Sequence, residues 1–207
     1  MKSNTIKTLL AAAASAVLLA STGFSQAAGT WTVGIGAHNI SPKASNSSAV
    51  GGQRAKTESD TQPTIAVEYF VWQNLGIELL ASTPYRHSVK VGGDYVAQTK
   101  LLPPTLSVQY HFVNASKFTP LIGVGVNYTT FFDTRSAGAL SGVDLDAKET
   151  WGFAGHVGVD YKLTERSSLR VDARWIESKS DIRVNGEKVG SLRLDPIVYG
   201  AAWVFRF

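Results

Sequence analysis

A two-residue alternation runs through the last nine positions of the chain, from Tyr199 to Phe207. Side chains of a β-strand point alternately to its two faces, so this period gathers the aromatic residues on one face. That face consists of Tyr199, Ala201, Trp203, Phe205 and Phe207, and the opposite face ends in Arg206. The pattern suits a strand with lipid on one side and a lumen on the other, although the edge strand of a soluble sheet shows the same alternation.

The first residues of the chain distinguish these two interpretations. Lys2 and Lys7 precede an apolar run of about 12 residues, 9–20, and Ser25-Gln26-Ala27 supplies the small residues that a signal peptidase recognises. The run is too short to span a bilayer as a helix, which needs about 20 residues. Residues 1–27 are therefore predicted to be a signal peptide cleaved after Ala27, which directs the chain out of the cytoplasm.

The mature chain, residues 28–207, is expected to form one domain. It contains no cysteine, so disulfides, metal–thiolate sites and redox pairs are excluded. Removing Lys2 and Lys7 leaves 18 basic against 16 acidic residues, a net charge of about +2 that gives no reason to expect a nucleic-acid partner. Charged residues make up 17% of the chain, below the roughly 25% of soluble domains, so much of the surface is expected to meet an apolar medium.

Seven further segments repeat the alternation of the C-terminal strand. Each has one face that is mainly apolar and one that mixes small, polar and charged residues. With the C-terminal segment, they span residues 31–38, 63–72, 75–82, 105–112, 121–129, 151–161, 169–175 and 199–207. Aromatic residues gather near the ends of these segments, as in the interfacial girdles of membrane barrels. This alternation favours eight membrane-crossing strands.

The connections between these segments alternate in length. Polar connections at 41–62, 84–102, 133–149 and 178–193 are long, whereas those at 73–74, 113–117 and 162–167 are short. Bacterial outer-membrane barrels have short periplasmic turns and long external loops. In the last long connection, Asn185-Gly186 is a good two-residue hairpin turn, which indicates an extension of the seventh and eighth strands. The sequence thus predicts an all-β fold, an eight-stranded antiparallel transmembrane β-barrel of the bacterial outer membrane.

Short motifs spread over nearly the whole mature chain resemble the OmpW family of small outer-membrane barrels. They are LGIELLASTP at 75–84, LPPTL at 102–106 leading into QYHF at 109–112, GVGVNYTTFFD at 123–133, GVDY at 158–161, RLDP at 193–196 and the closing FRF at 205–207. The resemblance implies a barrel for passive uptake of small hydrophobic molecules. It also implies that a solute enters from outside, passes an apolar pocket and leaves sideways into the bilayer through a gap in the wall.

Seven charged residues fall on the inward faces of the expected strands. They are Glu68, Glu78, Asp160, Arg170, Asp172, Arg174 and Arg206. An arginine facing lipid at the bilayer midplane costs roughly 2–4 kcal/mol, so these residues are expected inside the barrel. There the carboxylates and guanidiniums can pair, and we predict that they brace the wall and plug its periplasmic half. His38, His111 and His156 have the same inward parity and are expected to join this network.

Inward residues of another kind predict an apolar chamber above the plug. The large residues of inward parity are Phe70, Leu80, Leu121 and Phe131, and Gly34, Gly36, Gly123 and Gly125 leave volume beside them. The alternative is that the large side chains fill the space that the glycines leave. In either case an eight-stranded barrel has room inside for side chains or one small ligand, so a water-filled pore is not expected.

Two consecutive prolines, Pro103 and Pro104, precede the fourth expected strand. Proline donates no backbone hydrogen bond and is normally confined to the edges or ends of sheets. A seam in the wall at this position would give an apolar solute a route into lipid, and the family resemblance favours this hypothesis of a lateral gate. Simple termination of the strand at the loop is the alternative.

Catalysis and metal binding find little support in the sequence. Ser107 and His111 share a face but lie roughly 13 Å apart along a strand, too far for a nucleophile and its base. Asp144 and Asp146 form an isolated pair that is a weak signal for a cation. We therefore expect no enzyme activity, no metal site and no cofactor.

A non-transporting barrel with a structural, adhesin-like or stress-response role is the alternative to uptake. Such a barrel would place its function in the loops and fill its lumen completely. The expected partners are outer-membrane lipid, lipopolysaccharide, small hydrophobic solutes and the barrel-assembly machinery, and we expect a monomer. The assembly machinery would recognise the C-terminal aromatic residues Tyr199, Trp203, Phe205 and Phe207.

Overall fold

The computed structural model describes residues 26–41, 55–91, 94–138, 141, 145–147, 149–184, 187–193 and 195–207. These residues are mainly β-strand, and they contain no helix that is long and apolar enough to cross a membrane. Most of the predicted signal peptide, residues 1–25, and the predicted hairpin turn at 185–186 lie outside the described residues.

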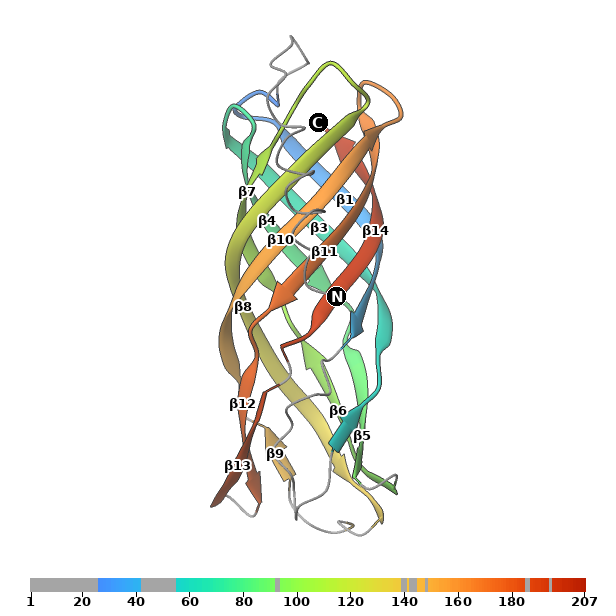
Figure 1. The fold of residues 1–207 in the computed structure, drawn as a ribbon, viewed down its shortest axis with the longest axis vertical. Coiled ribbons are helices and arrows are strands. Elements are labelled where there is room, and N and C mark those ends of the chain that lie inside the picture. The colour runs from blue at the N-terminus through green and yellow to red at the C-terminus, as the bar shows by residue number, and fades with distance from the viewer. Residues whose placement is uncertain are drawn as a thin grey trace, which may run out of the picture.

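Eight strands form a closed antiparallel wall (Figure 1). In chain order they are β1 (Trp31–Ser41), β3 (Asp60–Trp72), β4 (Leu75–Ser82), β7 (Thr105–His111), β8 (Phe118–Ser136), β10 (Thr150–Lys162), β11 (Ser167–Ile176) and β14 (Ile197–Arg206). Each of these strands pairs with the next one along the chain, and β14 pairs with β1 to close the ring. The eight-stranded barrel that the alternation predicts is confirmed.

The two ends of the barrel differ in the way the sequence predicts. The short turns that follow Trp72, His111 and Lys162 lie at one end, which also holds the start of β1 and the C-terminal Phe207 (upper end in Figure 1). Outer-membrane barrels keep their short turns in the periplasm, so this end is the periplasmic one. The long connections lie at the opposite, external end.

Six shorter strands extend the wall at the external end. They are β2 (Ala55–Thr57), β5 (Tyr85–Val91), β6 (Asp94–Leu102), β9 (Leu145–Ala147), β12 (Lys179–Val184) and β13 (Glu187–Arg193). β5 pairs with β6, β6 continues the ladder along β8, and β12 pairs with β13. Residues 84–102, expected as a long polar connection, are thus largely a paired hairpin. The pairing of β12 with β13 agrees with the expected extension of the seventh and eighth strands.

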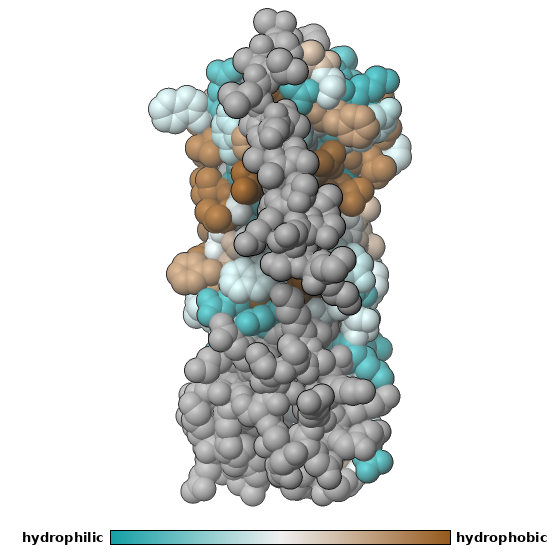
Figure 2. All heavy atoms as spheres, in the orientation of Figure 1, coloured by the Kyte–Doolittle hydropathy of each residue, from teal (hydrophilic) through white to brown (hydrophobic). Residues whose placement is uncertain are grey.

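The outer surface of the wall is apolar. Figure 2 shows apolar side chains around the upper, periplasmic part of the molecule, and Val124 and Phe153 are 69% and 70% exposed. Ring pairs lie at both margins of this band: Trp31 with Tyr69 and Phe118 with Tyr161 near the periplasm, and Tyr128 with Trp151 toward the outside, with centroids 4.7, 5.0 and 4.8 Å apart. An apolar band between two aromatic girdles is the surface that a bilayer requires.

Candidate functional site

A network of buried charges crosses the lumen from the part of the wall near the periplasmic turns, and Arg170 of β11, paired with Asp160 of β10, is its centre. The Nε and Nη2 atoms of Arg170 donate to the two carboxylate oxygens of Asp160 at 2.7 and 2.9 Å, and Nη1 donates to Glu78 at 2.8 Å. Glu78 lies across the lumen on β4 and is completely buried. This two-pronged contact with Asp160 and the contact across the lumen tie three strands together.

Asp172 is a second centre of the same network. Arg174 donates from Nε to Asp172 at 3.1 Å and from Nη2 to the second oxygen of Glu78 at 2.7 Å. The Nε2 atoms of His38 and His156 each lie 2.9 Å from an oxygen of Asp172. An ionised carboxylate only accepts hydrogen bonds, so we assign the proton of each imidazole contact to Nε2. The predicted participation of these two histidines is confirmed.

Glu68 of β3 extends the network toward the periplasm. Its carboxylate accepts from His111 Nε2 at 2.8 Å and from the Thr32 hydroxyl at 3.4 Å. Six of the seven charged residues with predicted inward parity therefore meet in one network. Arg206 is the exception, because its position near the end of β14 places it at the periplasmic mouth, where its guanidinium donates to the side-chain oxygen of Gln26.

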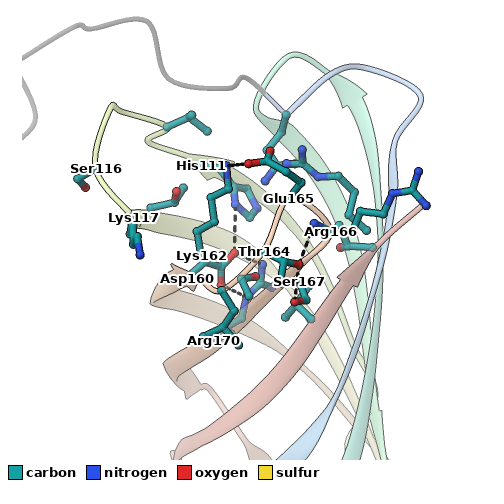
Figure 3. A pocket seen from close by; sticks show the side chains of 18 of the residues that line it. His111, Ser116, Lys117, Asp160, Lys162, Thr164, Glu165, Arg166, Ser167 and Arg170 are labelled. Atoms are coloured by element: carbon teal, nitrogen blue, oxygen red, sulfur yellow. Dashed lines mark hydrogen bonds and ion pairs between the residues drawn. The ribbon is translucent and has the colours of Figure 1, made fainter.

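The charged network blocks the lumen. The cavity among its members has a volume of about 10 Å³, room for little more than one water molecule. On the periplasmic side a vestibule of about 420 Å³ opens, with Lys117 and Arg166 near its mouth (Figure 3). His111, Asp160 and Arg170 form its inner end. The vestibule therefore ends at the network.

An apolar cluster lies on the external side of the network. It consists of Ile40, Tyr85, Leu101, Ala154, Ile176 and Val198, and Phe131 packs against it. Tyr85 and Leu101 come from the hairpin of β5 and β6, so the extension of the wall supplies part of this core. The cavity beside the cluster has a volume of about 20 Å³. The external half of the described lumen is thus mainly apolar and nearly filled, with buried His87, Thr129 and Ser178 among its inward residues.

The four large residues predicted to line one apolar chamber lie at different heights. Phe131 packs on the external cluster, Leu80 lines the small cavity among the charges, and Phe70 faces the periplasmic vestibule. Leu121 is buried opposite His111 of β7. All four point inward, but the prediction that they line a single chamber is wrong. Parity fixes the face of a side chain, whereas its height depends on the pairing register between strands.

The inward glycines bring neighbouring strands close together. A Cβ atom at Gly36 or Gly125 would overlap a carbonyl oxygen of the adjacent strand, and one at Gly123 would have its nearest neighbours at 3.0 Å. At Gly34 the nearest atoms would be 3.5 Å away, an ordinary contact distance. The space expected beside Gly36 and Gly125 is therefore taken up by backbone, and Gly34 alone of these four has room for a methyl group.

Pro103 and Pro104 form a break in the wall. β6 pairs with β8 up to Leu102, opposite Thr130, and β7 resumes the pairing at Thr105, opposite Asn127, so the two prolines interrupt the pairing without shifting its register. Both prolines are half-buried, and Pro103 lines the cavity beside the apolar cluster. The interrupted pairing thus lies next to the apolar cluster.

The C-terminal aromatic residues point outward. Tyr199, Trp203, Phe205 and Phe207 are between 41% and 78% exposed, as their parity predicts. Their recognition by assembly machinery stays a prediction. No group of three or more possible metal ligands occurs in the part of the chain that the structure describes, and Asp144 lies outside that part.

Sequence reasoning missed the inward residues of the external hairpin. Tyr85 and His87 are each 2% exposed and Leu101 is 5% exposed, although all three fall in a segment expected as loop. The alternation of Tyr85 and His87 with the exposed Arg86 was the available signal for a strand. Asn127 was also missed, because inward parity alone does not reveal that its partners are proline carbonyl groups.

The closed antiparallel wall, the apolar outer band and the charged interior define a small β-barrel of the bacterial outer membrane. This is the class of protein that the fold and the interior establish. The chain belongs to the OmpW family, whose sequence profile matches residues 27–207. The resemblance carried by the sequence motifs is thereby confirmed.

Similar proteins cover most of the chain. Outer membrane protein W of Salmonella typhi is 38% identical over 212 residues, which cover 97% of this chain and 96% of that protein. The dibenzothiophene metabolism operon protein PahQ of Pseudomonas aeruginosa is 27% identical over 160 residues, 73% of this chain and 74% of that protein. The crystal structure of OprG from Pseudomonas aeruginosa is similar with a TM-score of 0.76 and 31% identity, and covers 87% of this chain and 97% of that chain.

Proposed function

We propose that this barrel takes up small hydrophobic molecules passively. A solute enters from outside, reaches the apolar cluster and leaves sideways into the bilayer at Pro103 and Pro104. The observation that carries the proposal is the position of Pro103, which belongs both to the break in the wall and to the lining of the apolar cavity. On the outer face beside the break, Leu106 and Val126 form an exposed apolar pair that would pass the solute to lipid.

The charged network supports lateral rather than periplasmic exit. A solute that continued toward the periplasm would have to separate Arg170 and Arg174 from Glu78, and all three side chains are buried. Leaving a buried charge without its partner costs about 3–5 kcal/mol. The break at the prolines contains no charged side chain, so it offers the lower barrier to an apolar solute.

A relative's name supports the class of solute. PahQ is named for a dibenzothiophene metabolism operon, and dibenzothiophene is an apolar aromatic compound. The cavity of about 20 Å³ is smaller than such a molecule, so side chains of the cluster must move to admit it. Phe131 is the first candidate, because it is only partly buried and packs at the margin of the cluster.

The test of the lateral route is the double variant Pro103→Ala/Pro104→Ala. Alanine restores two backbone donors, so the seam is expected to close and uptake of naphthalene into cells is expected to slow. Pro120→Ala is the matched control, because Pro120 lies near the start of β8, away from the seam. Unchanged uptake in a double variant that folds and inserts like the wild type would reject the lateral gate.

The alternative of a non-transporting barrel is favoured by one observation, the nearly filled lumen. Cells with and without the protein separate the two functions when the uptake of a hydrophobic compound is compared with that of small amino acids. If the protein is an uptake barrel, it is expected to accelerate entry of the hydrophobic compound and not that of the amino acids. Equal rates in both strains for every solute would leave the structural role as the better account.

A further inference from the structure

Asn127 of β8 lies on the inner side of the break in the wall. Its side chain is buried, with 1% of its surface exposed. Its Nδ2 lies 2.9 Å from the carbonyl oxygen of Pro103, 3.1 Å from that of Pro104 and 2.9 Å from the hydroxyl of Thr105. One amide group therefore contacts three consecutive residues of the segment that joins β6 to β7.

This contact adds to the backbone pairing with β8, which the prolines make incomplete. Neither Pro103 nor Pro104 has an N–H group to donate to β8. The backbone of β8 donates from Tyr128 N to the Pro104 carbonyl oxygen at 3.0 Å. The carbonyl of Pro103 accepts from the side chain of Asn127 at 2.9 Å. At this level the proline segment is thus held to β8 by one backbone hydrogen bond and by the side chain of Asn127.

The same side chain is connected to the apolar cavity. The hydroxyl of Thr129 donates to Asn127 Oδ1 at 2.6 Å, which holds the amide with its Nδ2 toward the prolines. Thr129 and Pro103 both line the cavity beside the apolar cluster. Two of the groups to which Asn127 is hydrogen-bonded therefore border the space that a solute would enlarge.

We infer that Asn127 is the latch of the lateral opening, a positioning residue that holds the Pro103–Pro104 segment closed against β8 until an apolar solute fills the cavity. The inference rests on the proposed uptake function, and it adds the residue that controls it. Hydrogen bonds at an apolar boundary are retained because no water replaces them. A solute that moves Thr129 and Pro103 weakens several of these bonds at once, so occupancy and opening are linked.

The first test measures the seam without any transport. Amide hydrogen exchange of Tyr128 is followed by NMR on the full barrel in lipid nanodiscs, for the wild type and Asn127→Leu. Each hydrogen bond lost contributes roughly a factor of 2 to 10, so exchange at Tyr128 is expected to accelerate about tenfold or more. Ser107→Ala is the matched control, since Ser107 is an inward, buried residue of β7 whose hydroxyl has no hydrogen-bond partner in the described structure.

The second test links the seam to solute. Naphthalene added to the wild type is expected to accelerate exchange at Tyr128, and it is expected to add little in Asn127→Leu, where the latch is already lost. In cells the leucine variant is expected to take up naphthalene faster than the wild type, and Ser107→Ala at the wild-type rate. If Asn127→Leu fails to insert, Thr129→Val removes the hydroxyl that orients the amide while keeping the side-chain shape, and a smaller effect in the same direction is expected.

The outcomes separate the latch from the uptake function. Unchanged exchange at Tyr128 in a folded Asn127→Leu barrel would overturn the latch. Where the wild type transports naphthalene, an Asn127→Leu variant with faster exchange but no faster uptake would overturn it as well. If the wild type itself gives no more uptake than cells lacking the protein, the uptake function fails even where the exchange result holds. Faster exchange together with faster uptake supports both.

Discussion

At the scale of single residues, Glu78 shows how strongly the interior depends on paired charge. Its two oxygens accept from Arg170 and Arg174 at 2.8 and 2.7 Å, and none of its surface is exposed. Glu78→Ala removes the carboxylate that bridges the two guanidiniums and leaves one buried N–H group of each without its acceptor, so we expect the free energy of unfolding to fall by about 3–5 kcal/mol. Urea unfolding in detergent micelles measures this loss.

The control for this prediction is Arg206→Ala. Arg206 is a charged inward residue of the same barrel, but it lies at the periplasmic mouth outside the charged network, where its contact is with Gln26, a residue of the predicted signal peptide that the mature chain lacks. Its removal is expected to cost far less than that of Glu78. Equal losses for the two variants would show that the network contributes no more than an ordinary polar contact.

His87 gives the external hairpin a dependence on pH. Burial lowers the pKa of His87 from its usual value of 6.5, against the hydrogen bond that its Nδ1 donates to the Glu58 carbonyl at 2.7 Å. The folded hairpin therefore favours the neutral imidazole, and its stability is fully present above pH 6.5. As the pH falls through 6.5 toward the lower folded pKa, the opened hairpin takes up the proton more readily and stability is lost.

This dependence is measured by amide exchange in β5 and β6 at pH 7.5 and 5.5, corrected for the intrinsic effect of pH on exchange. The wild type is expected to open more readily at the lower pH, and His87→Phe is expected to lose the difference because phenylalanine does not titrate. If the wild type and the variant respond alike, His87 is not the titrating group.

At the scale of elements, the wall strands could be predicted because their signal is local. Residues 105–111 alternate between buried and exposed at every position, and lipid on one face makes that alternation visible in the sequence. Beyond the membrane no lipid imposes an apolar face, so the alternation in the hairpin of β5 and β6 is a weaker signal than that of the wall strands. The height of a side chain also depends on register, which is why Phe70 and Phe131 were assigned to one chamber although they lie on opposite sides of the plug.

The seam between elements can be closed covalently, since the chain has no cysteine of its own. Leu102 and Thr130 face each other across β6 and β8 at the external edge of the break. In Leu102→Cys/Thr130→Cys the oxidised pair is expected to fix the segment next to Pro103, because directly opposed antiparallel residues lie about 4.5–5.5 Å apart, within disulfide range. Naphthalene uptake into proteoliposomes is expected to drop and to recover with reductant.

The matched pair for the disulfide is Val108→Cys/Val124→Cys, which joins β7 to β8 away from the seam. Its oxidation is expected to leave uptake unchanged. Undiminished uptake with the first disulfide fully formed would show that β6 need not move from β8 during transport, and the exit would have to lie elsewhere in the wall.

At the scale of the whole molecule, the two halves of the lumen have opposite character, and this predicts uptake without ion conductance. The aqueous vestibule of about 420 Å³ ends at the charged network, and the cavity within the network is about 10 Å³. The external half is mainly apolar and nearly filled, so the described residues leave hydrated ions no continuous path. In planar bilayers the wild-type barrel is therefore expected to carry no steady current above that of the lipid alone, while the same preparation in liposomes accelerates the entry of naphthalene. A steady current from the folded wild type would mean that the network opens to water, and the periplasmic route would then have to replace the lateral one.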